Sequence, residues 1–162
     1  MTDLLLQRSA VISPCGRYRY RLTRSWAQGG LLPFVMLNPS TADADIDDPT
    51  IRRCMSFARR EGAAGIVVGN LFAFRATDPK ALASVRDAYG PDNEMALHLI
   101  LYDASNAGLP VVCSWGTQGN GQFFVQRAQS LGSRLACLGT TKGGHPRHPL
   151  YVRGDQPLEP FP

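Results

Sequence analysis

The chain has 162 residues, of which 44% are hydrophobic and 19% charged, and its formal net charge is +4. This length suits one domain with a hydrophobic core, and no apolar run approaches the roughly 18 residues of a membrane span. The start of the chain carries Asp3 and lacks the pattern of a secretory signal, so we expect a cytoplasmic protein. The basic balance permits a polyanionic partner but does not require one.

Residues 4–26 are predicted to form an N-terminal β-ribbon. The segment SPCG at 13–16 has the composition of a tight turn. In the arm that follows, Arg17, Arg19 and Arg21 alternate with aromatic and apolar residues, which is the two-residue period of a half-buried strand. This arginine face is either a surface that binds phosphates or a solvated edge whose charge prevents aggregation.

Four short apolar runs then predict strands that are buried on both faces. They lie at residues 34–37, 65–74, 110–115 and 134–139. Three helical patterns separate them, at residues 48–61, about 92–107 and about 120–132. The first helix has the clearest ends, with Asp48 as N-cap, Pro49 as its first residue and Gly62 after its last turn. The alternation predicts an α/β protein, a three-layer α/β/α sandwich on a short, mostly parallel four-stranded sheet.

We expect one domain over residues 1–162, with the ribbon at 1–30 and the α/β core at 31–153. The proline-rich segment 154–162 is expected to be a loose tail. Four cysteines have no CxxC spacing and are predicted to be buried free thiols: Cys15, Cys54, Cys113 and Cys137.

Polar and aromatic residues follow every predicted core strand. The carboxyl ends of parallel strands meet at one edge of a sheet, and ligands bind there, so these residues are predicted to form one site. They are Asn38, Pro39 and Ser40 after the first strand; Asn70, Phe72 and Arg75 in or after the second; Trp115 after the third; and Lys142, His145, Arg147, His148 and Tyr151 after the fourth. The loops at the opposite edge carry few such side chains.

The residue types suggest roles at this edge. Asn70 interrupts an apolar strand, and its amide could recognise the donor and acceptor groups of a planar base. Phe72 either stacks on such a ligand or belongs to the core. His145 and His148 lie in one basic loop, which suits the stabilisation of a developing anion, although both could be ordinary loop histidines. Ser40 lacks the GxSxG frame of a nucleophile and is expected to cap a turn.

An acidic loop follows the first of these strands. Its carboxylates, at Asp43, Asp45, Asp47 and Asp48, raise the question of a Mg²⁺ site. The EF-hand pattern is absent, and Asp48 is expected to serve as a helix cap. We therefore expect no metal and no cofactor, with three of the acids as loop residues.

Five segments resemble a bacterial and phage family known only as domain-of-unknown-function family 1643. They are FVMLNPSTAD, DDPTIRRC, NLFAFRATDP, SWGTQG and PRHPLYV. The resemblance covers most of the chain and implies no activity.

A more distant resemblance is to the uracil-DNA glycosylase superfamily, whose members are α/β/α sandwiches on a short parallel sheet. This resemblance implies that Asn38 of MLNPS positions an attacking water and that Asn70 recognises the base edge. It also implies that His148 of RHPLY, or less well His145 of GHPRH, stabilises the departing base. The chain departs from the superfamily pattern at Leu150, where a serine is usual.

Three functions are compatible with these observations. The first is a DNA N-glycosylase-like hydrolase, in which Arg147, Arg153 and the arginine face would hold phosphates. The second is a non-catalytic protein that binds nucleic acid or a nucleotide. The third is a hydrolase or transferase that acts on a small nucleotide or nucleoside.

Overall fold

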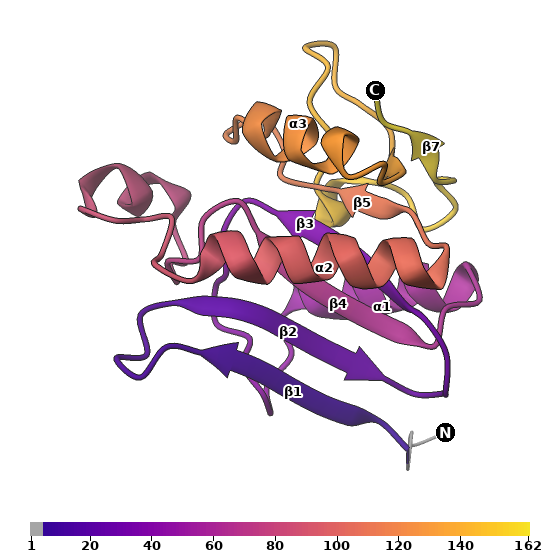
Figure 1. Ribbon diagram of the computed structural model, residues 1–162, viewed down its shortest axis with the longest axis horizontal. Coiled ribbons are helices and arrows are strands. Elements are labelled where there is room, and N and C mark those ends of the chain that lie inside the picture. Colours follow the sequence, from indigo (N-terminus) through magenta and orange to yellow (C-terminus); the bar gives the residue numbers. More distant parts are fainter. Residues whose placement is uncertain (1–4) are drawn as a thin grey trace.

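The structure is a computed structural model that describes residues 5–162. Within these residues, one mixed sheet has seven strands in the order β1-β2-β4-β3-β5-β6-β7 (Figure 1). The strands are β1 (Gln7–Ile12), β2 (Arg19–Ser25), β3 (Leu31–Met36), β4 (Gly65–Asn70), β5 (Val111–Cys113), β6 (Leu135–Cys137) and β7 (Glu159–Pro160). The helices are α1 (Pro49–Arg60), α2 (Asn93–Ala107) and α3 (Gln122–Ser130), with the short 3₁₀ helices η1 (Pro79–Ser84) and η2 (Pro149–Tyr151).

The α/β class is confirmed, and the parallel core consists of β4, β3, β5 and β6. The sheet is larger than the predicted four strands because both flanks extend it with antiparallel strands. The ribbon joins through β2, in which Leu22 lies opposite Val68 of β4. At the other edge β7 pairs with β6.

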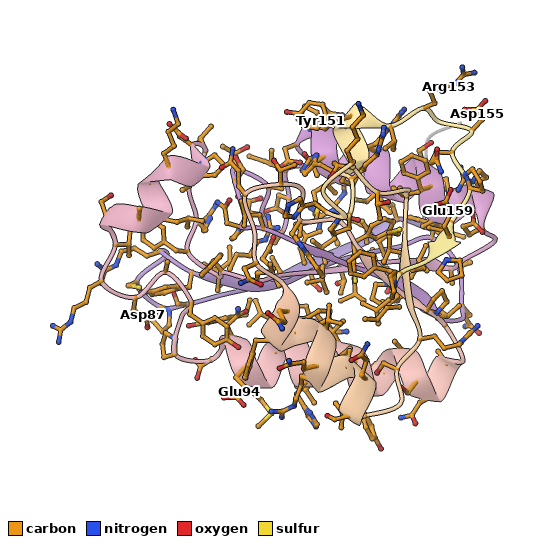
Figure 2. All side chains as sticks on the ribbon, turned by 90° about the horizontal axis from the view of Figure 1, so that it is seen from above. Asp87, Glu94, Tyr151, Arg153, Asp155 and Glu159 are labelled. Carbon is orange, nitrogen blue, oxygen red and sulfur yellow. The ribbon has the colours of Figure 1, made fainter. Side chains whose placement is uncertain are left out.

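Helices cover both faces of the sheet, as Figure 2 shows with α1 and η2 above it and α2 and α3 below. Alternate residues of a strand point to opposite faces. Phe34 therefore packs with Ile51 of α1 in one buried cluster, whereas its neighbour Val35 packs with Leu101 of α2 in the other. Asp48 caps α1 as predicted, because its Oδ1 accepts a hydrogen bond from the backbone N–H of Ile51 at 2.9 Å.

The segment predicted as a loose tail instead holds the last strand of the sheet. Phe161 donates its backbone N–H to Leu135 at 3.0 Å, and its ring meets Trp115 edge-to-face at 5.7 Å. This aromatic contact holds residues 159–161 against the sheet. The proline content of the segment does not predict it.

The predicted arginine face does not form. Arg19 is buried, Arg21 pairs with Asp103 of α2 at 3.6 Å, and Arg17 is exposed in the turn. A register shift between Val11 and Ile12 breaks the strict alternation of the ribbon. Moreover, β2 lies between β1 and β4 and is not an edge strand.

Three of the four cysteines are buried, as predicted, but Cys15 is exposed. Burial raises the pKa of the Cys54 and Cys113 thiols above their ordinary value. In the turn, a hydrogen bond with Ser13 and contacts with Arg17 lower the pKa of Cys15 to about 7.

Arg24 of β2 is fully buried and links the ribbon to the acidic loop. Its Nε donates to Asp47 at 2.7 Å. Its two terminal nitrogens donate to backbone carbonyls of Ser9, Thr23, Asp43 and Ile46. All five N–H groups of this guanidinium therefore have acceptors.

We predict that Arg24→Met lowers the free energy of unfolding by about 3–5 kcal/mol, because Oδ1 of Asp47 and several carbonyls lose their donor. Urea denaturation measures this difference. The matched control is Arg21→Met, whose half-exposed ion pair with Asp103 should contribute less than about 1 kcal/mol. Equal stability of the two variants would contradict the anchoring role of Arg24.

Candidate functional site

The connections that follow two neighbouring strands of the parallel core run to opposite faces of the sheet. β3 leads into α1 on one face, and β5 leads into α3 on the other. Ligands of open α/β sheets bind at such a switch point. A cavity of about 460 Å³ lies here, within the size range of small-molecule sites.

Several of the predicted site residues line this cavity. They are Asn38, Pro39, Ser40, Trp115, Arg147, His148 and Tyr151. The structure thus brings together residues from the loops that follow β3, β5 and β6.

The other predicted residues lie outside the cavity lining. Phe72 lines a separate cavity of about 220 Å³ with residues of α2 and α3. Arg75 donates to the carbonyl of Gly16 at 3.3 Å, and Lys142 is exposed. His145 lines a third cavity beside Trp115. Asn70 is buried in the last position of β4.

Asn38 lines the cavity and joins two loops. Its Nδ2 donates to the carbonyls of Ala76 at 2.9 Å and of Pro39 at 3.1 Å. Both partners are acceptors, so the amide nitrogen must face them and Oδ1 must face away. Oδ1 accepts no hydrogen bond from residues 5–162, which leaves an acceptor for a ligand or a water molecule.

His148, which also lines the cavity, is held in a defined orientation. Its Nδ1 accepts a hydrogen bond from the backbone N–H of Leu150 at 3.3 Å, which caps η2. Burial lowers the pKa of His148, although the negative charge of Asp48 opposes the shift. The ring is therefore neutral near pH 7, and its proton must lie on Nε2. His148 offers this Nε2–H as a hydrogen-bond donor.

Contacts from α1 and from the loop that follows β5 hold the loop of His148 in place. Arg53 of α1 donates to the carbonyls of Pro149, at 3.2 Å, and of Val152. From the other side, Gly116 donates its N–H to Pro146 at 2.9 Å. Gly116 has φ of 73°, a conformation that glycine adopts most easily.

Three residues at the carboxyl ends of β3, β4 and β5 lie side by side on one face of the sheet: Met36, Asn70 and Ser114. Met36, which lines the cavity, pairs with Asn70 of β4, and continuation of the β3–β5 register places it beside Ser114. Strand alternation puts the side chains of Asn70 and Ser114 on the same face as Met36. Both amide atoms of Asn70 and the hydroxyl of Ser114 are buried without a hydrogen-bond partner among the described residues. Such groups are destabilising unless a water or a ligand satisfies them.

Two charged residues of the cavity, Arg19 and Asp48, are not among the site residues that the sequence predicts. A strict two-residue alternation places Arg19 on a surface face, because it does not take account of the register shift in the ribbon. Asp48 was treated as occupied by its capping bond, but that bond uses only Oδ1. Among the described residues that line the cavity, Asp48 carries the only carboxylate.

Two of the other acids of the loop, Asp43 and Asp47, have protein partners for their carboxylates. Asp43 accepts hydrogen bonds from the backbone of Asp45 and Ile46, both at 2.8 Å, and these lower its pKa. Asp47 pairs with Arg8 and Arg24. Within residues 5–162, no group of three or more His, Cys, Asp or Glu side chains is arranged to hold a metal ion.

Comparison with known proteins agrees with the first resemblance. Residues 19–150 match the family described as "Protein of unknown function (DUF1643)". The chain belongs to the DUF1643 family. The matched segment of this DUF1643 protein includes the cavity-lining residues from Arg19 to His148, and only Tyr151 lies beyond it. No curated protein and no solved structure matches the chain.

Across residues 5–162 of this DUF1643 protein, every helix is too short or too polar to span a bilayer.

The lowered pKa of His148 predicts a pH dependence of stability. The unfolded chain binds a proton near pH 6.5, whereas the folded protein binds it only at a lower pH. Stability should therefore fall as the pH drops through about 6.5 toward the folded pKa. We predict that His148→Asn, which can still cap η2, has a shallower decline in melting temperature between about pH 7.5 and 5. An identical slope in both proteins would contradict the buried, neutral state of His148.

Proposed function

We propose that this DUF1643 protein is a hydrolase that cleaves the N-glycosidic bond of a nucleobase-bearing substrate. The observation that carries the proposal is the convergence of Asn38, Asp48 and His148 on one cavity at the switch point. These side chains supply an acceptor, a carboxylate and a neutral donor. The resemblance of MLNPS and RHPLY to motifs of the uracil-DNA glycosylase superfamily suggests this reaction class.

In the proposed reaction, a water molecule attacks the anomeric carbon of the sugar. The bond between this carbon and the base nitrogen breaks, and its electron pair leaves with the base. Asn38 Oδ1 accepts a hydrogen bond from the water and orients it, while the Asp48 carboxylate accepts the proton that the water loses. The Nε2–H of His148 donates to the negative charge that develops on the base, which solvent later protonates.

The role of Asn70 in this scheme stays a prediction. Asn70 lies beside Met36 on the same face of the sheet and is not one of the residues that line the cavity. A shift of the flexible Met36 side chain would open a route from the cavity to the unsatisfied Asn70 amide. The amide would then be able to recognise the edge of a base.

The second candidate function is non-catalytic binding of a nucleotide or nucleic acid. One observation favours it: Asn38 uses both N–H groups of its amide to join the loops at 38–40 and 75–77. A residue that serves mainly to fix this geometry would be needed for binding without any chemistry.

We predict that the wild-type protein releases free base and that Asn38→Ala slows the release by at least about 100-fold, because the attacking water is no longer oriented. The substrates are nucleoside 5′-monophosphates and oligonucleotides with uracil or damaged bases, and chromatography measures the released base. The matched control is Asn106→Ala, an exposed position on α2 that should keep full activity. Melting temperatures establish that both variants are folded.

Release of no base from any of these substrates by the wild-type protein would rule out the hydrolase. Binding of a nucleotide without release would then favour the second candidate function.

A further inference from the structure

Two buried arginines of the same strand differ in how their charges are satisfied. Arg24 is 0% exposed, and its guanidinium has an acceptor for every N–H, including the Asp47 carboxylate. Arg19 is 2% exposed, and its Nη1 donates to the carbonyl of Ala42 at 2.9 Å. Its Nε is buried without a partner among the described residues, and within 5–162 no salt bridge joins Arg19 to a carboxylate.

A buried cation that lacks a carboxylate partner and leaves an N–H without an acceptor is costly to the folded state. Burial lowers the pKa of Arg19 to about 10, so the guanidinium still carries its charge near pH 7. Asp48 attracts this charge from a distance without forming an ion pair. The interior of the protein therefore leaves a positive charge incompletely satisfied.

The position of Arg19 indicates what would satisfy it. Arg19 is one of the residues that line the same cavity as Asn38 and His148. Arg147 lines the cavity as well, so cations outnumber carboxylates among the described lining residues. A guanidinium presents several N–H groups in a geometry that matches the oxygens of a phosphate.

We propose that Arg19 binds the phosphate group of a small nucleotide inside this cavity, and that the substrate is a free nucleotide and not duplex DNA. The inference rests on the proposed function for the base and the glycosidic bond. Because residue Arg19 is only 2% exposed, a phosphate must enter the cavity to contact its guanidinium. The phosphodiester backbone of a duplex instead follows the protein surface, where exposed basic groups meet it.

The surface arginines agree with this choice of substrate. Arg153 projects from the surface in Figure 2 and is already paired with Asp155 at 3.0 and 3.1 Å. The predicted arginine face of Arg17, Arg19 and Arg21 does not form, because Arg19 is buried and Arg21 pairs with Asp103. A cavity of about 460 Å³ has room for a ligand of mononucleotide size.

Isothermal titration calorimetry of the full chain tests the proposal, with five nucleoside 5′-monophosphates (adenine, guanine, cytosine, uracil and thymine) and the matching nucleosides as probes. We expect at least one monophosphate to bind at least about tenfold more tightly than its nucleoside, because the charged hydrogen bonds to phosphate are lost in the nucleoside. Arg19→Met should remove this preference, and Arg19→Lys should restore part of it.

The matched control is Arg86→Met, an exposed arginine away from the cavity, which should keep the preference. Equal binding of monophosphate and nucleoside, no binding of any probe, or an undiminished preference in a folded Arg19→Met variant would overturn the proposal. Arg19-dependent binding of a short DNA duplex with no binding of monophosphates would also overturn it. Tight, Arg19-dependent binding without release of base would uphold the phosphate site and reject only the hydrolase.

Discussion

The complete burial of Arg24 is the constraint on which the arrangement of the site depends. A buried guanidinium needs an acceptor for each N–H, and the loop between β3 and α1 supplies several of them through Asp43, Ile46 and Asp47. The loop must therefore fold back against β2. This path delivers Asp48 to the start of α1 and fixes the far end of the segment that begins at Asn38.

The same strand supplies a second arginine with a different role. Arg19 and Arg24 are both buried, but only Arg24 is matched by a carboxylate. The unmatched charge lies in the cavity, together with the Asn38 acceptor and the His148 donor. Asn70 and Ser114, on either side of Met36, also have buried polar atoms without a hydrogen-bond partner among the described residues. Under our proposal the two arginines therefore differ in role: the protein satisfies Arg24, which stabilises the fold, whereas Arg19 binds a ligand.

The sequence predicted the parallel core and the edge that holds the cavity, because apolar runs and helix caps depend on local chemistry. The apolar run predicted the first core strand only from residue 34, whereas β3 begins at Leu31 and includes Pro33, although proline rarely occurs inside a central strand. The structure accommodates Pro33 because β5 pairs with β3 only from Phe34 onward, which no local pattern reveals. The burial of Arg19 depends likewise on a register shift between strands, and the pairing of β7 depends on Phe161 reaching Trp115. Long-range contacts of this kind leave no periodic signal in one sequence.

The most direct test of the central claim is a crystal structure of the protein grown with the tightest-binding nucleoside 5′-monophosphate. The account predicts the ligand in the cavity between the loops that follow β3, β5 and β6, with its phosphate on Arg19. The base should lie toward His148, with the anomeric carbon close to Asn38 and Asp48. A ligand bound elsewhere, such as in the cavity between α2 and α3, or a phosphate remote from Arg19, would contradict it.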